Sequence, residues 1–271
     1  MHAALQEDIE YGEAGGTRLS MDARIPEGHG PFPAVIIVHG GAWVGGDRRS
    51  SVLPLFQPLE DAHIASFSIS YRLAKGGPEG FKLPTSIPQI LKFGTAVDDV
   101  RHAVAYVKEH AAEYNVDPDR VALLGESAGA QLASMAALKP GREGRVRAVV
   151  ALYGPSDMAK MVETSEWIPD AVRDSLKGTA FASVLVGALH EFSPVNWVSK
   201  EAPPFLLIHG TEDPFVPFSQ SEEFCEKLKA SGASCKLVPV KDGGHGLLKW
   251  ESAGHTEYKK ELVHWLKHEL H

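Results

Sequence analysis

Apolar and polar positions change their period repeatedly along the chain, and each change indicates where a strand or a helix begins. Residues 8–26 predict two strands joined by a glycine turn. Residues 32–38 (FPAVIIV) are almost continuously apolar, as expected of a central strand that is covered on both faces. Residues 95–114 instead place an apolar stripe at helical spacing from Val97 to Val107, which predicts a helix of about five turns.

Strand-like and helix-like segments continue to alternate to the end of the sequence. Further strands are expected at 63–73, 121–125, 147–154, 203–210 and 235–240, and further helices at 127–139, 219–231 and 256–270. This order predicts the α/β class, with one mostly parallel sheet of eight strands and helices on both faces. Residues 156–197 form the long interruption after the sixth strand. We interpret them as a small, cap-like helical insertion within a single domain that covers residues 1–271.

Composition and charge narrow the classes of function. Hydrophobic residues make up 44% and charged residues 23% of the chain, which are ordinary globular values. The net charge of −8 supplies no basic surface, so neither nucleic acid nor a membrane is expected as a partner. Residues 1–16 lack the pattern of a signal peptide. The expected location is therefore cytoplasmic if the chain is full length, and secreted or periplasmic if it is a trimmed mature form.

Cysteine and histidine positions give little sign of a disulfide framework or a metal site. Cys225 and Cys235 are too few for such a framework, and two free, partly buried thiols are expected, although a bridge between them is conceivable. His264 and His268 lie four residues apart on one face of the last helix. A zinc-protease helix requires Glu directly after its first histidine, where this chain has Trp265. No metal is expected.

The strongest local signal is the pentapeptide GESAG at 125–129, which has the G-x-S-x-G spacing of a nucleophile elbow between a strand and a helix. Ser127 would occupy a strained turn that projects its hydroxyl above the sheet, while the flanking glycines let strand and helix pass closely. Glu126 is expected to make local hydrogen bonds and not to act as a catalytic acid. A tight β–α turn that happens to contain serine has the same spacing, so the strand–turn–helix context carries the interpretation.

A serine nucleophile requires a histidine base, and the base requires an acid that orients it. In proteins with this elbow the order along the chain is Ser, Asp, His, with the acid and the base in loops after later strands. Asp213 follows the expected strand at 203–210, and His245 follows the one at 235–240. These two residues are our candidates.

Other acids and histidines near the strand ends compete for the two roles. Asp157 follows the preceding strand and ranks second as the acid. Glu212 should point away, and Asp242 is too close in sequence to the candidate histidine to face its ring. His39 and His209 each end a strand, and we expect them to pack and to bond backbone groups.

The sequence HGGAW at 39–43 directly follows a predicted strand. An acyl-transfer enzyme must stabilise an oxyanion, and backbone N–H groups do so without rearranging. In chains with a G-x-S-x-G elbow, this loop supplies part of the oxyanion hole. Gly41 and Ala42 are the expected donors, joined by Ala128 after the elbow serine. A simple glycine turn is the alternative interpretation.

The elbow, acid, histidine and HGGAW together resemble the α/β-hydrolase superfamily, and more narrowly its esterase/lipase group with an HGG-type oxyanion loop. The similarity extends over nearly the whole chain and includes SISYRL, VALLGESAGAQLA, PPFLLIHGTEDPFVP and DGGHG. Compact bacterial carboxylesterases of the feruloyl- and acetyl-xylan-esterase type are the most similar branch, because the insertion is short and the first residues have the pattern of strands.

This resemblance implies cofactor-free hydrolysis of a carboxylic ester through an acyl-enzyme, in which Ser127 attacks, His245 transfers the proton and Asp213 holds the imidazole. The implied substrate is a small-molecule or carbohydrate-linked ester of an acetyl, short acyl or hydroxycinnamoyl group. An amidase, formamidase or peptidase with the same triad stays open, because the fold alone does not determine the bond cleaved. A non-catalytic binding member of the fold is a third interpretation, against which the intact set of residues argues.

Three aromatic residues are candidates for substrate contact. Trp43 lies in the expected oxyanion loop, Phe215 lies two residues after the candidate acid, and Trp167 lies in the insertion. Ordinary packing explains each of them equally well. The sequence leaves the acyl and alcohol specificity and the oligomeric state open.

Overall fold

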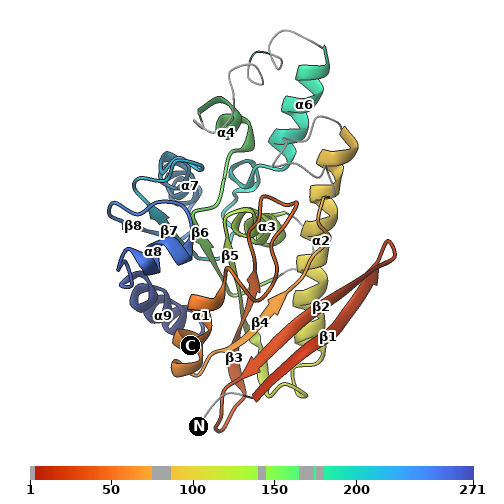
Figure 1. Cartoon of the computed structure of the whole chain (residues 1–271), viewed down its shortest axis with the longest axis vertical. Helices are drawn as coiled ribbons and strands as arrows, with labels where there is room; N and C mark the ends of the chain where they lie inside the picture. The colour runs from red at the N-terminus through yellow and green to blue at the C-terminus, as the bar shows by residue number, and fades with distance from the viewer. Residues whose placement is uncertain (1–3, 75–86, 140–144, 165–173, 175–179) are drawn as a thin grey trace.

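The computed structural model describes residues 4–74, 87–139, 145–164, 174 and 180–271, and it shows a twisted central sheet with helices on both sides (Figure 1). In the described part, eight strands are arranged in the order β1-β2-β4-β3-β5-β6-β7-β8. The pairs β1–β2 and β2–β4 are antiparallel, and all other pairs are parallel. The predicted α/β-hydrolase class and mostly parallel sheet are confirmed.

Each strand expected from the sequence is present, although some of the boundaries differ. The strands are β1 (Ala4–Ala14), β2 (Thr17–Ile25), β3 (Phe32–Val38), β4 (Ala65–Ile69), β5 (Val116–Glu126), β6 (Ala148–Leu152), β7 (Phe205–Gly210) and β8 (Cys235–Val240). Every residue of β4, β6 and β7 is buried, as expected of central strands covered on both faces, and in β4 this includes Ser66 and Ser68. The register pairs Val38 with Gly125, so the segments after β3 and β5 leave the sheet side by side.

Two layers of helices cover the sheet. They are α1 (Leu53–Asp61), α2 (Ile87–Glu109), α3 (Ala128–Leu138), α4 (Met158–Thr164), α6 (Ala180–Glu191), a 3₁₀ turn (Pro194–Trp197), α7 (Ser219–Ala230), α8 (Leu247–Ser252) and α9 (Tyr258–Glu269). Alternate residues of β3 face opposite layers: Ile36 packs in the core under α2, α3 and α7, whereas Val35 and Ile37 pack in the core under α1, α8 and α9. None of the described helices is long and apolar enough to cross a bilayer.

Several boundaries differ from the predictions. Helix α1 was not expected, because Pro54 and Pro58 break its helical pattern, yet it forms with one proline in its first turn. The six-residue helix α8 is too short to show a period. Strand β5 begins at Val116 rather than Val121, because the turn-like NVDPDR segment pairs with the start of β3. The insertion predicted at 156–197 contains α4, α6 and the 3₁₀ turn in its described part.

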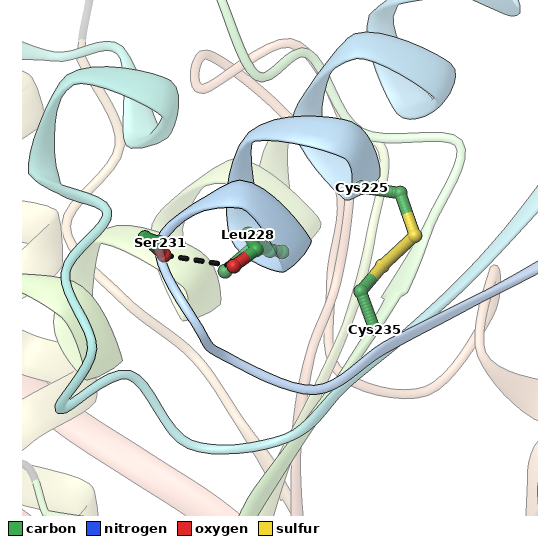
Figure 2. The surroundings of a disulfide bond; sticks show 4 residues. All are labelled: Cys225, Leu228, Ser231 and Cys235. Carbon is green, nitrogen blue, oxygen red and sulfur yellow. Dashed lines mark hydrogen bonds between the residues drawn. A yellow bond between two sulfur atoms is a disulfide. The ribbon is translucent and has the colours of Figure 1, made fainter.

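The prediction of two free thiols is wrong, since Cys225 and Cys235 form a disulfide (Figure 2). Helix α7 ends in a turn at Ser231 and Gly232, where a hydroxyl donates to the carbonyl of Leu228 and the glycine has a φ of 88°. The turn sends the chain back along the helix into β8. The two Cα atoms therefore lie 5.5 Å apart, within the range that a disulfide spans. A spacing of ten residues could not show this reversal.

Candidate active site

The turn at Ser127 has the strained backbone expected of a nucleophile elbow. Ser127 lies between β5 and α3 with φ 53° and ψ −122°, outside the regions that L-residues ordinarily occupy. Strand and helix touch at the two flanking glycines: a Cβ atom on Gly125 would lie only 2.2 Å from the carbonyl oxygen of Gly129. The glycines therefore permit the close approach that carries the serine above the sheet.

The three candidate triad residues lie in one chain of hydrogen bonds. Ser127 Oγ is 2.9 Å from His245 Nε2, and His245 Nδ1 is 2.6 Å from Asp213 Oδ2. Asp213 comes from the loop after β7 and His245 from the loop after β8. Since a carboxylate faces Nδ1, that nitrogen carries the proton and Nε2 accepts from the serine hydroxyl. This is the geometry that a general base requires.

Asp213 is buried, and N–H groups surround its carboxylate. Its Oδ1 accepts hydrogen bonds from the backbone N–H groups of Phe215 and Val216, both at 2.9 Å. Its Oδ2 also lies 3.3 Å from Nε2 of His209. Burial by itself raises the pKa of Asp213, but the hydrogen bonds from His209, His245 and Val216 outweigh it and hold the pKa below its ordinary value of 3.8. The carboxylate stays ionised.

The competing residues have other partners. Asp157 accepts a hydrogen bond from the backbone N–H of Lys160 at the start of α4. Buried His39 donates from Nδ1 to the carbonyl of Gly40, and Glu212 and Asp242 are exposed.

His209 supports the candidate acid rather than replacing His245. Its Nε2 donates to the carbonyl of Val216 at 2.9 Å, so this nitrogen carries a proton. Its Nδ1 then accepts from the hydroxyl of Ser221, on the first turn of α7, at 2.7 Å. The expectation that His209 packs and bonds a backbone group is confirmed.

The loop after β3 presents free backbone N–H groups beside the serine. Gly41, Ala42 and Trp43 all have positive φ angles, of 113°, 53° and 64°. Within the described residues, the N–H groups of Gly41 and Ala42 donate to no acceptor. Ala128 is the first residue of α3, where a helix leaves its N–H free. These three residues line the same cavity as the serine and the histidine.

That cavity has a volume of about 410 Å³ and mostly apolar walls. It is lined by Gly41, Ala42, Trp43, Ser51, Glu126, Ser127, Ala128, Pro155, Met161, Phe215, Val216 and His245. Both described aromatic candidates lie in its wall. The exposed Phe215 ring packs in a T-shaped arrangement against His245, whereas the Trp43 indole is buried and donates to the side chain of Gln131. The third candidate, Trp167, lies outside the described residues.

Four wall residues, Ser51, Pro155, Met161 and Val216, were not expected from the sequence. Ser51 lies between β3 and α1, in a segment that no motif marked. Pro155 and Val216 lie in the loops after β6 and β7, and their place beyond strand ends was an available signal. Met161 lies on α4 of the insertion, where no motif marked it. Among the described side chains, no group of three or more His, Cys, Asp or Glu residues could hold a metal ion.

The chain matches a known protein family and a curated esterase. The chain matches the family model described as BD-FAE over residues 21–228, which include Ser127 and Asp213. It is similar to the esterase LipQ of Mycobacterium tuberculosis, with 31% identity over 86% of this chain and 55% of that protein. The chain spans about half the length of the curated relatives it matches.

Solved structures share the fold. A bifunctional GH43-CE of Bacteroides eggerthii has a TM-score of 0.76 at 25% identity, over 98% of this chain and 35% of that one. A truncated carbohydrate esterase from gut microbiota has a TM-score of 0.73 at 22% identity, over 99% of this chain and 97% of that one. At such low identity, the second likeness shows the fold alone.

Proposed function

The chain belongs to the BD-FAE family of α/β-hydrolase esterases, and from this premise we propose that it hydrolyses carboxylic esters through an acyl-enzyme on Ser127. The observation that carries the proposal is the continuous hydrogen-bonded chain Ser127–His245–Asp213, which opens on a cavity beside free backbone N–H groups. The name of the relative LipQ supports ester hydrolysis as the reaction.

Acylation follows from the positions of the hydrogen-bonded atoms. Nε2 of His245 takes the hydroxyl proton of Ser127 while Oγ attacks the ester carbonyl carbon. The carbonyl oxygen becomes an oxyanion, which accepts hydrogen bonds from the N–H groups of Gly41, Ala42 and Ala128. The oxyanion then reforms the carbonyl, and the bond from the carbonyl carbon to the alcohol oxygen breaks while the imidazolium gives its proton to that oxygen. The alcohol leaves, and the acyl group stays on Ser127.

Deacylation repeats the same steps with water. His245 takes a proton from water, the resulting nucleophile attacks the acyl carbon, and the proton returns to the departing Oγ of Ser127. Asp213 holds the imidazole in one orientation throughout and stabilises its positive charge. Its low pKa keeps it an acceptor at neutral pH.

The sequence resemblance and the size of the cavity support the proposed substrate class. A small-molecule or carbohydrate-linked ester of an acetyl, short acyl or hydroxycinnamoyl group fits within about 410 Å³, a volume typical of small-ligand sites. Trp43, Met161 and Phe215 provide an apolar wall against which the acyl group can pack. On this proposal residues 1–271 form one hydrolase domain, with 156–197 as a small cap-like insertion within it.

The test is hydrolysis of p-nitrophenyl acetate, butyrate and octanoate and of methyl ferulate, with the matching anilides alongside. Wild type should cleave esters, and Ser127→Ala should lose at least about 10⁴-fold in kcat. Ser134→Ala is the matched control, since it removes a hydroxyl that bonds only within α3. Equal activity of wild type and Ser127→Ala would refute the mechanism. Faster turnover of anilides than of esters would refute ester specificity.

A further inference from the structure

Glu126, the residue before the candidate nucleophile, has a buried carboxylate with both oxygens occupied. Its Oε1 accepts a hydrogen bond from the backbone N–H of Gly40 at 2.7 Å, and its Oε2 accepts from the hydroxyl of Tyr153 at 2.9 Å. These partners lie 86 and 27 residues away along the chain, so the expectation of local hydrogen bonds is wrong. The carboxylate therefore joins the oxyanion loop after β3 to the segment after β6.

Tyr153 extends this connection to a third loop. Its hydroxyl oxygen accepts a hydrogen bond from the backbone N–H of Leu247 at 3.1 Å, two residues beyond His245. The Tyr153 ring also packs in a T-shaped arrangement against the His245 imidazole, with ring centroids 4.8 Å apart. Tyr153 is fully buried and does not line the cavity, so it reaches the site only through these neighbours.

The backbone of Tyr153 is strained in a way that this contact explains. Its φ is 41°, a conformation that a bulky side chain rarely adopts. The backbone N–H of Tyr153 donates to the carbonyl of Ile208 and fixes the residue at the end of β6. Strain of this kind persists where the surrounding structure enforces it, and it concentrates near functional sites. The strained turn is what places the hydroxyl between Glu126 and Leu247.

Gly40 has a specific reason to lack a side chain. A Cβ atom on this residue would lie 2.7 Å from Oε1 of Glu126 and 2.9 Å from both its Cδ and its Oε2. The glycine therefore leaves room for the carboxylate to reach the N–H group. In HGGAW, the first glycine serves the contact with Glu126, and the second serves the turn that exposes the donors.

We propose that Glu126 and Tyr153 are positioning residues, which form one buried hydrogen-bonded bridge that holds the oxyanion loop in register with the His245 loop. The bridge runs from the N–H of Gly40 through both side chains to the N–H of Leu247. The inference rests on the proposed ester hydrolysis. Neither residue transfers a proton to substrate; the bridge sets the distance between the oxyanion donors and the base.

Energetics favour one cooperative unit over two separate contacts. When a buried carboxylate or hydroxyl loses one partner, a polar group is left unsatisfied. The free-energy cost of that unsatisfied group exceeds the net stabilisation that one hydrogen bond provides. Displacement of either loop would break a contact of the bridge. The oxyanion loop and the His245 loop therefore keep their relative position when substrate enters.

The test is a double-mutant cycle on p-nitrophenyl acetate with Glu126→Gln, Tyr153→Phe and the double variant. Both substitutions nearly preserve side-chain shape. Tyr153→Phe should lower kcat about tenfold, because it removes a hydrogen bond to the charged Glu126. It should leave KM within about twofold, because the Tyr153 side chain does not line the cavity. Glu126→Gln should lower kcat about tenfold in wild type and less than about threefold in the Tyr153→Phe background, since members of one bridge are not additive.

Tyr11→Phe is the matched control. It removes another buried tyrosine hydroxyl, which donates to the carbonyl of Ser70 away from the cavity, and kcat should stay within about twofold of wild type. The proposed bridge would be overturned if Glu126→Gln lowered kcat by the same factor in wild type and in Tyr153→Phe. It would also be overturned if Tyr153→Phe and Tyr11→Phe had the same kcat. A wild type that hydrolyses no ester would instead refute the proposed function, so the two failures are distinguishable.

Discussion

Removal of the Cys225–Cys235 disulfide should destabilise the protein and leave its catalytic rate at 25 °C nearly unchanged. The disulfide joins the middle of α7 to the start of β8, an edge strand of the sheet. Neither cysteine lines the cavity or bonds a residue of the candidate triad. The effect should therefore be visible in unfolding and not in kinetics.

The magnitude follows from the length of the closed loop. The cross-linked residues are ten positions apart, and closing a loop of this length removes unfolded-state entropy worth about 3 kcal/mol at 25 °C. For 271 residues, an unfolding entropy of about 2.1 cal/mol/K per residue amounts to roughly 0.6 kcal/mol/K. Dividing the loop-closure free energy by the unfolding entropy predicts a fall in Tm of about 5 °C.

The assay is thermal unfolding of wild type and of the Cys225→Ala/Cys235→Ala variant, each with and without a strong thiol reductant. Reductant should lower the Tm of wild type by about 5 °C and should not change that of the double variant, which is the control for effects of the reductant itself. Two thiols that react with an alkylating agent in unreduced native protein, together with a Tm insensitive to reductant, would refute the reasoning.

Three further changes probe the triad and the oxyanion loop. Asp213→Asn should lower kcat about 10⁴-fold with little change in KM, and a loss under tenfold in steady-state ester hydrolysis would contradict its role. Because the folded pKa of Asp213 lies below 3.8, its stabilising contribution is present above about pH 4 and is lost as pH falls through the folded value. The difference in free energy of unfolding between wild type and Asp213→Asn, measured in urea, should therefore shrink below about pH 4, and a constant difference would contradict this. Gly40→Ala should lower kcat about 100-fold, because its Cβ would collide with the Glu126 carboxylate beside the oxyanion loop. Gly187→Ala is the control and should leave kcat unchanged, because Gly187 is an exposed helix residue with open space around it. Equal kcat values for the two variants would contradict the role of the contact between Gly40 and Glu126.

Continuous apolar runs were sufficient to predict the centre of the sheet. The segments that became β3, β6 and β7 are short, apolar and bounded by polar or turn-forming residues, so their burial follows from composition alone. Helix α1 could not be predicted this way, because Pro54 and Pro58 suggest an interrupted helix. Packing of Leu55, Phe56 and Leu59 against the sheet core stabilises it nevertheless.

The candidate triad was accessible from the sequence because each member has a local marker. Ser127 has its elbow glycines, and Asp213 and His245 each follow a predicted strand in the required order. The bridge through Glu126 had no such marker, because it depends on register: Val38 pairs with Gly125, which brings Gly40 beside Glu126. The hydrophobic periodicity of a sequence does not determine strand register. It therefore cannot predict contacts between loops that register alone brings together.

The most direct test of the central claim is peptide mass spectrometry after reaction with a fluorophosphonate, which labels an activated serine. An activated Ser127 should carry one adduct per chain, and this adduct should form much more slowly in His245→Ala. A folded wild type that stays unlabelled, or that carries the adduct on another residue, would contradict the assignment of Ser127 as the nucleophile.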